Sequence, residues 1–389
     1  MSPQRRRDLA PRGRANVHNV QMHRYASHLV RHAEPGVAVE VAADNLLAAL
    51  GGEQPTLVIV TASNEFRDHA EDLRSTLLQR FPRAQIAGAV IAGGVIGVAE
   101  EVERGAAVSL LAAVLPADQI VVSALDDAAD LPDEGGVVVL FADPFSVPAE
   151  SLITLADQRG IELVGGFTGG VGYGQARLIT TERILTTGAV GVQLTLPGVT
   201  TIVSQGARPI GSDLVVTAAE RNIVLELAGK PAVEQLHAVL NSLSPDDLIL
   251  ARKGLMAGIV IDENRPDYDV GDFLVRGLLG VEPDSGGLAI AAEPRVGQTF
   301  RFHVRDGVGA DQDLRRAIAA QQTPPGAALL FACNGRGRQM FDVDHHDAAV
   351  VQELLDVPLT GAFCQGELGP VTGANYVHAF TATMLTFPR

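Results

Sequence analysis

The run TLVIVTAS, residues 56–63, is short, apolar and rich in β-branched side chains, so it predicts a buried strand. Apolar side chains then recur at helical spacing from Phe66 to Phe81, and Pro82 ends this pattern, which predicts a helix. The run QIAGAVIAGGVIG, residues 85–97, predicts a second strand. This order of strand, helix and strand indicates a fold of the α/β or α+β class.

Strands outnumber helices along the rest of the chain. Short β-rich segments fill residues 176–204 with no room for a helix between them, which favours antiparallel pairing, and a second antiparallel meander is predicted after residue 254. We therefore predict an α/β (α+β) protein with two domains of mainly antiparallel sheets covered by helices, and we consider an α/β/β/α layering. The predicted parts are a basic leader, a first domain and a second domain, at residues 1–32, 33–248 and 249–389. Further helices are predicted at residues 148–160, 232–243, 311–322 and 347–355.

Charge and composition exclude several classes of protein. The chain has 389 residues and a net charge of −16, although residues 1–32 are basic. An acidic body repels phosphate backbones, so we expect no nucleic-acid partner. The leader lacks the apolar segment of a secretory signal, and we expect it to be disordered. No apolar run is long enough to span a bilayer, and two cysteines form no disulfide framework, so we expect a soluble cytoplasmic protein without a membrane partner.

One strand ends in an unusual group of side chains. In LLFACNGRGRQMF, residues 329–341, an apolar run stops at Cys333 and Asn334, and Arg336 follows between two glycines. Unpaired polar groups at the end of a buried strand cost free energy, so these side chains need partners. They either tie the two domains together or line a cavity in which a small anion completes the network.

Two other motifs are weak. The stretch GGFTGGVGYG, residues 165–174, has neither the pattern nor the lysine of a phosphate loop, so it predicts a turn and no nucleotide cofactor. In DVDHHD, residues 342–347, carboxylates and imidazoles are close in sequence, but Asp347 is well placed to begin the following helix. We therefore predict no metal site and no cofactor.

Several stretches resemble the FIST family. The resemblance is carried by AALLFACNGRG (327–337), PLTGAFCQGELGP (358–370), HAFTATMLTF (378–387), GDFLVRGLLGV (271–281) and VGGFTGG (164–170). The family implies a sensory protein with paired N- and C-domains that binds a small ligand, and amino acids are the usual suggestion. It implies no catalytic residue. A signalling protein is then a candidate partner, and the resemblance leaves the oligomeric state open.

From these observations we predict a ligand site formed by Cys333, Asn334, Arg336, Glu367 and His378. An arginine fork fits a carboxylate and Glu367 fits an ammonium group, so the ligand is expected to be an amino acid or another small carboxylate. We expect binding without catalysis. One alternative is an enzyme that uses Cys333 or a Glu367–His378 pair, and a second is a scaffold for other proteins.

Overall fold

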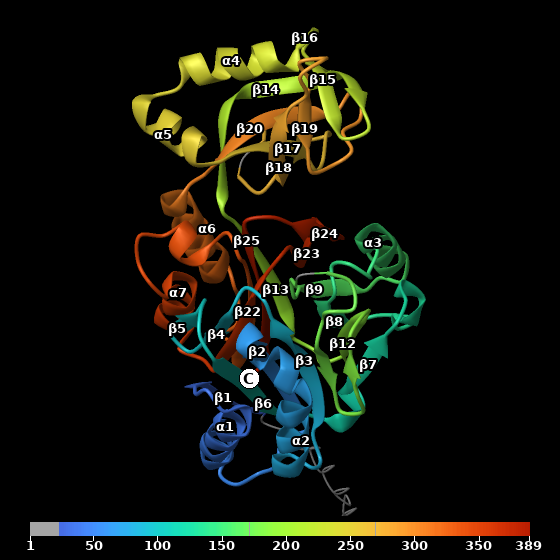
Figure 1. The fold of residues 1–389 in the computed structure, drawn as a ribbon, viewed down its shortest axis with the longest axis vertical. Coiled ribbons are helices and arrows are strands. Elements are labelled where there is room, and N and C mark those ends of the chain that lie inside the picture. The colour runs from blue at the N-terminus through green and yellow to red at the C-terminus, as the bar shows by residue number, and fades with distance from the viewer. Residues whose placement is uncertain (1–22, 171, 269) are drawn as a thin grey trace, which may run out of the picture.

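A computed structural model describes residues 23–170, 172–268 and 270–389. It has a larger lower unit of three sheets and a smaller upper unit (Figure 1). The α+β class is confirmed, with mainly antiparallel sheets and helices on their outer faces. No helix in these ranges has the length and hydropathy needed to cross a membrane.

The lower unit consists of three repeats of the same topology. The first contains β1 (Arg24–Arg31), α1 (Pro35–Ala49), β2 (Leu57–Ser63), η1 (Asn64–His69), α2 (Ala70–Arg80), β3 (Gln85–Ile91), β4 (Val95–Gly97), β5 (Glu100–Val102) and β6 (Ala107–Val114). The second contains β7 (Ile120–Leu125), β8 (Val137–Ala142), α3 (Ala149–Gln158), β9 (Glu162–Phe167), β10 (Leu178–Thr180), β11 (Ile184–Leu185) and β12 (Ala189–Leu194). The third contains β13 (Thr200–Gln205), α6 (Gly307–Ala319), β21 (Ala327–Cys333), η4 (Gly337–Gln339), α7 (His346–Leu355), β22 (Leu359–Cys364), β23 (Glu367–Val371), β24 (Ala374–His378) and β25 (Thr381–Phe387).

The three sheets share one strand order. They run β1-β6-β2-β3-β10-β11 in sheet 1, β7-β12-β8-β9-β23-β24 in sheet 2 and β13-β25-β21-β22-β4-β5 in sheet 3. In each, the central pair is parallel and the other pairs are antiparallel. Each repeat gives its hairpin to a neighbouring sheet: β4–β5 joins sheet 3, β10–β11 joins sheet 1 and β23–β24 joins sheet 2. The repeats are therefore interlocked.

A glycine marks the same position in each repeat. A Cβ atom on Gly88, Gly165 or Gly361 would lie 1.8, 2.0 or 1.9 Å from a backbone oxygen of the adjacent parallel strand, so only glycine fits there. The residues paired with these glycines on the donated hairpins are Ile179, Leu368 and Ile96, respectively. This shared register aligns the three repeats residue by residue, although the sequence shows no tandem repeat.

The core of the lower unit lies between the three sheets. Alternate side chains of each central strand, such as Ile59, Phe141 and Phe331, point into one shared apolar cluster. The other side chains of these strands pack on the helices outside, which are α1 and α2 on sheet 1, α3 on sheet 2, and α6 and α7 on sheet 3. The sheets thus surround the core from three sides instead of stacking in layers.

The upper unit is inserted in the third repeat, between β13 and α6. It contains β14 (Ala207–Glu220), β15 (Ile223–Leu227), β16 (Lys230–Pro231), α4 (Ala232–Ser242), α5 (Pro245–Lys253), β17 (Leu255–Val260), β18 (Phe273–Val281), β19 (Leu288–Ile290) and β20 (Thr299–Arg305). The order is β14-β20-β17-β18-β19-β15-β16, and β15 also pairs with β14, so six of the strands close into a barrel. The predicted boundary at residues 248 and 249 lies inside α5, and the division into independently folding domains stays a prediction.

The leader is where the sequence prediction needs correction. Arg24–Arg31 is not disordered, because β1 pairs along its whole length with β6 in sheet 1. Arg24 and Arg31 stand at the two ends of the strand and form ion pairs with Glu53 and Glu100, while Ala26 is buried. The sequence prediction missed this short strand because its positive charge was taken as part of a basic tail. Residues 1–22 lie outside the described ranges.

Candidate ligand-binding cleft

A cleft of about 1200 Å³ lies where the two units meet. Residues of β17, β18 and the segment after β19 line it from the upper unit, and α3, β24 and the ends of β21 and β22 line it from the lower unit. Figure 1 shows β18 and β19 above β23 and β24 at this place. Because the cleft has walls from both units, a molecule bound there contacts both.

The carboxyl ends of two parallel strands open into the cleft. Cys333 ends β21 and is in register with Cys364, which ends β22. Cys333, Asn334 and Gln365 line the cleft, and the Asn334 backbone N–H donates to the Cys364 carbonyl at 2.8 Å. In sheets with parallel strands, ligands bind outside the carboxyl ends of those strands. The cleft therefore has the position expected of a binding site.

The Cys333 thiol is protonated at neutral pH. Its Sγ accepts a hydrogen bond from the Gly335 backbone N–H at 3.5 Å. Burial, and then the neighbouring carboxyl group of Glu367, raises the pKa of this thiol to about 12. A thiol acts as a nucleophile only as the thiolate, so this environment disfavours catalysis by Cys333.

Glu367 and His378 face each other in register on β23 and β24, and both are buried. Burial raises the pKa of Glu367 to about 8 and lowers the pKa of His378 to about 4. His378 Nε2 lies 3.0 Å from the Gly369 carbonyl oxygen, to which it donates, and Glu367 Oε2 accepts from the Thr381 hydroxyl at 2.8 Å. At neutral pH the imidazole is therefore neutral and the carboxyl group is mainly protonated. His378 lines the cleft, whereas Glu367 does not.

Arg336 is fully buried and forms an ion pair inside the third repeat. Its Nε and Nη2 donate to the two carboxylate oxygens of Asp347 at 2.7 and 2.8 Å, and its guanidinium lies over the Phe341 ring. Asp347 is in the first turn of α7, so the pair ties this helix to the end of β21. Arg336 does not line the cleft, and its role toward a ligand stays a prediction.

Asp347 is not the N-cap that the sequence suggested. His345 has that position, in the left-handed region at φ 62°, and Asp347 points toward Arg336 instead. Glu101, from the hairpin that the first repeat gives to sheet 3, accepts the Ala348 backbone N–H at 2.9 Å. Glu101, which is far from α7 in the sequence, thus supplies the hydrogen-bond acceptor for a backbone N–H in the first turn of α7.

Sequence reasoning missed Arg276, which lines the cleft from β18. Its guanidinium donates to the Val275 carbonyl oxygen at 3.0 Å, and no ion pair to it is found in the described ranges. Burial lowers the pKa of Arg276 to about 10, since no carboxylate offsets the loss of water. The available signal was the single charge in FLVRGLLGV, residues 273–281, a run otherwise typical of an apolar strand.

The cleft also carries exposed charges of both signs. Arg221 and Arg295 line it from the upper unit, together with Glu293. Glu150 and Asp157 line it from α3. The wall around Arg276 can therefore meet a ligand that has both an anionic and a cationic group.

Comparison with protein families gives two matches that cover nearly the whole chain. The FIST N domain matches residues 56–230, and the FIST C domain matches residues 232–370. The division between them falls just before α4, within the upper unit. These matches confirm the resemblance found in the sequence.

Similar proteins occur in mycobacteria. The uncharacterized protein Mb0898c of Mycobacterium bovis is 39% identical over 356 residues, which is 87% of this chain and 92% of that protein. The uncharacterized protein Rv0628c of Mycobacterium tuberculosis is 38% identical over 379 residues, which is 90% of this chain and 99% of that protein. Among solved structures, a cyanuric acid hydrolase from A. caulinodans aligns over 95% of this chain and 99% of its own, with 10% identity and a TM-score of 0.30.

Proposed function

The chain belongs to the FIST family, whose domains are associated with sensory signal transduction, and we propose that it binds a small carboxylate in the cleft without converting it. The ligand class that we propose is the free amino acid, with its carboxylate on Arg276.

The unpaired guanidinium of Arg276 is the observation that carries this proposal. A cation that has lost much of its water and has no carboxylate partner destabilises the folded chain. A bound carboxylate supplies two parallel acceptors that match the guanidinium fork, and such charged hydrogen bonds contribute about 1.5–3 kcal/mol each. A bound anion would thus give the Arg276 guanidinium the ion-pair partner that the described residues do not supply.

The remaining charges suit the other end of an amino acid. Glu150 and Asp157 lie on α3 across the cleft from the upper unit, and Glu293 lies beside Arg295. A carboxylate near an ammonium group lowers the free energy of the bound zwitterion. A simple monocarboxylate lacks this second contact, so we expect it to bind more weakly than an amino acid.

The position of the cleft suits a sensor. Only two chain segments join the units, next to Gly206 and Asp306, and the Asp306 backbone N–H donates to the Gly206 carbonyl at 3.4 Å. A ligand that contacts both walls favours an arrangement in which the two units lie closer together around the cleft. A signalling protein can recognise this arrangement. Small-angle scattering should therefore show a smaller radius of gyration on saturation with the ligand.

Catalysis and scaffolding are the two alternatives. The protonated Cys333 thiol and the neutral His378 imidazole make poor nucleophile and acid–base groups at neutral pH, which favours binding. Consumption of a bound compound, followed by mass spectrometry, would support an enzyme. A failure of every amino acid and carboxylate to bind would favour a scaffold.

The test compares Arg276→Met with Arg252→Met by calorimetric titration of an amino-acid panel. Arg252 is an exposed arginine of α5 outside the cleft, so its variant is the matched control. We expect Arg276→Met to weaken binding by about 10- to 100-fold, the loss of one charged hydrogen-bond pair, without lowering the melting temperature. Equal affinity in the two variants would contradict the assignment of Arg276.

A further inference from the structure

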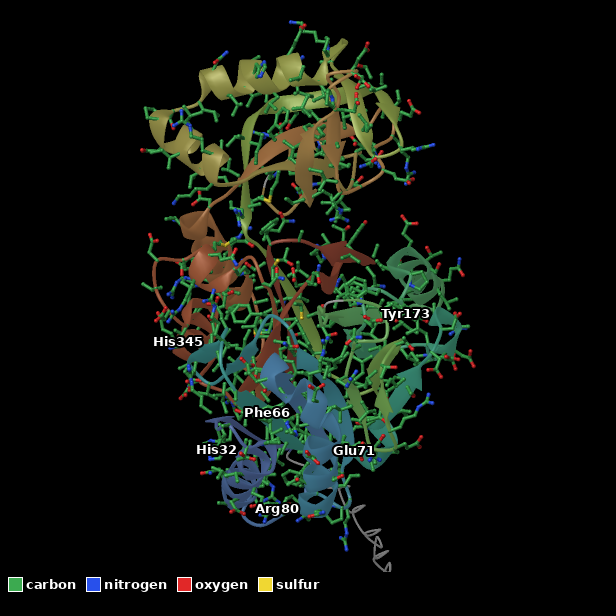
Figure 2. All side chains as sticks on the ribbon, viewed as in Figure 1. His32, Phe66, Glu71, Arg80, Tyr173 and His345 are labelled. Atoms are coloured by element: carbon green, nitrogen blue, oxygen red, sulfur yellow. The ribbon has the colours of Figure 1, made fainter. Side chains whose placement is uncertain are left out.

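A second cavity, of about 470 Å³, lies on the flank of sheet 3. We call it the side pocket. Its walls come from β5 and the residues after it, from Arg31 at the end of β1, and from Arg338 and His345 between β21 and α7. Figure 2 labels His345 at this flank of the lower unit, and no residue lines both the side pocket and the cleft.

A buried carboxyl group lines this pocket. Glu101 is only 5% exposed, and its Oε1 accepts the Ala348 backbone N–H. Its Oε2 is buried and has no hydrogen-bond partner within the described ranges. An unpaired buried oxygen destabilises the folded chain, so a donor that reaches it gains this hydrogen bond.

The threefold register shows that the fold does not require a charge at Glu101. Gly361 pairs with Ile96, which pairs with Glu101 across the hairpin. The corresponding residues of the other two donated hairpins are Ile184 and Val377. Two repeats thus place an aliphatic side chain where the first places a carboxylate, and the hydrogen bond from Ala348 at the start of α7 uses only one of its two oxygens.

The carboxylates around Glu101 favour a cation. Burial, and then the neighbouring carboxyl groups of Asp347 and Glu103, raise the pKa of Glu101 to about 8. Ala348 N–H and the more distant Arg336 oppose this shift, but Arg336 is already paired with Asp347. A positive group beside Glu101 would offset the repulsion between these carboxyl groups.

The arginines of the rim are mostly engaged. Arg31 pairs with Glu100, and Arg338 pairs with Asp344. Glu103 Oε1 accepts the Arg338 backbone N–H at 2.9 Å, and His345 Nδ1 accepts the Glu101 backbone N–H at 3.0 Å. Arg104 is exposed at the mouth. Glu101 Oε2 is therefore the buried oxygen of this group that has no hydrogen-bond partner among the described residues.

We infer that the side pocket is a second binding site, which takes a small organic cation with a primary ammonium group held by Glu101 and Glu103. The ammonium group donates one hydrogen bond to Glu101 Oε2, and its short alkyl part occupies the pocket beside Val102. This site is separate from the proposed carboxylate site, so a negative result at one site does not contradict the proposal for the other.

Binding of the cation is coupled to loss of a proton. The ammonium group needs the ionised form of Glu101, whose fraction falls tenfold for each pH unit below the pKa. The affinity should therefore rise about tenfold from pH 6 to pH 7 and level off above about pH 8. Titrations at pH 7 in two buffers of different ionisation enthalpy should show release of a proton.

The experiment is calorimetric titration of propylammonium chloride into the full chain. We expect Glu101→Gln to weaken binding at least tenfold and to abolish proton release, because the amide keeps the acceptor for Ala348 but has no charge. The matched control, Glu40→Gln, changes an exposed carboxylate of α1 that is outside the pocket lining, and should leave the affinity within twofold. Glu103→Gln, a second variant in case Glu101→Gln does not fold, should weaken binding and lower the pH at which affinity levels off.

Three results would overturn the inference. Propylammonium could fail to bind at pH 9, or it could bind Glu101→Gln as it binds the parent. Tetramethylammonium, which has charge but no N–H donor, could bind as tightly. Binding of acetate that Arg104→Gln abolishes would instead make the pocket an anion site.

Discussion

Two arginines show how the lower unit and the cleft differ. Arg336 is fully buried in the lower unit, and Asp347 satisfies its charge in a bidentate pair. Arg276, in the wall of the cleft, has lost much of its water, and among the described residues its guanidinium has only a backbone carbonyl as its partner. A paired buried charge acts within the structure, whereas an unpaired one is available to a ligand. The most distinctive motif of the sequence therefore contains an arginine that is paired inside the lower unit, and the strand β18 contains the arginine that lines the cleft.

The sharpest test of this difference is the stability of Arg336→Met. Removal of the guanidinium leaves Asp347 buried and uncompensated, although Arg336 and His346 now hold its pKa at about 2 against the effect of burial. We expect a loss of about 3–5 kcal/mol in the free energy of unfolding, measured with urea. This exceeds the small cost expected of a residue that serves a ligand alone.

A double variant separates the ion pair from general damage. Arg336→Met with Asp347→Leu removes both charges, and it should recover much of the stability that the single change loses. If Arg336→Met instead stays within about 1 kcal/mol of the parent, the pair is not structural, and Arg336 returns to the candidate ligand contacts.

The next test contrasts the packing of the two units. A Cβ atom at Gly361 of β22 would lie 1.9 Å from the Leu330 carbonyl oxygen, whereas one at Gly277 of β18 meets nothing within 4 Å. We expect Gly361→Ala to cost about 3 kcal/mol, as overpacking does, and Gly277→Ala to cost less than about 0.5 kcal/mol. Similar losses for both alanine variants, in thermal unfolding, would show that the interlocked unit tolerates a backbone shift.

The last expected effect is a slope of stability with pH, which is small over any single pH unit. The folded chain holds the Glu367 proton up to about pH 8, whereas the ordinary pKa of this side chain is 4.5. The stabilisation from this proton is thus complete below pH 4.5 and is lost as the pH rises through 8, at about 1 kcal/mol per pH unit. Glu101 contributes with the same sign.

Glu367→Gln has no proton to lose and keeps an acceptor for Thr381, so its stability should fall less steeply between about pH 5 and 8. Glu162→Gln, on an exposed side chain of β9, is the control and should keep the slope of the parent. Urea unfolding at four pH values gives both slopes. A slope in Glu367→Gln as steep as in the parent would assign the pH dependence to other groups.

Local patterns in the sequence predicted individual elements well. The strand β2, the helices α3, α4 and α7, and the antiparallel meander of the upper unit follow from short-range periodicity and from turn residues. The helix α1 was missed, because its many valines and alanines give little contrast between an apolar and a polar face. The strand β1 was missed because its terminal arginines were counted with a basic tail.

The predicted ligand site stays a prediction, and the structure shows only which of its residues line the cleft. Cys333, Asn334 and His378 line the cleft, as polar residues at strand ends allow, while Arg336 and Glu367 are buried away from it. Arg276 and Glu101 gave no such signal. Each became a candidate binding residue because its buried polar group lacks an ion-pair or hydrogen-bond partner in the folded chain. The spacing of residues in the sequence does not show which groups find a partner on folding.

By itself, the sequence determined that this chain forms short buried strands and that polar groups follow the strand of Cys333, although the one strand predicted at residues 85–97 is two strands, β3 and β4, in different sheets. Those properties depend on neighbouring residues, through side-chain alternation and turn chemistry. Only the tertiary structure decided that hairpins are exchanged between three repeats, since the paired residues, such as Gly165 and Leu368, are far apart in the chain. It also decided which buried charge has a partner, because desolvation and ion pairing depend on groups that folding alone brings together.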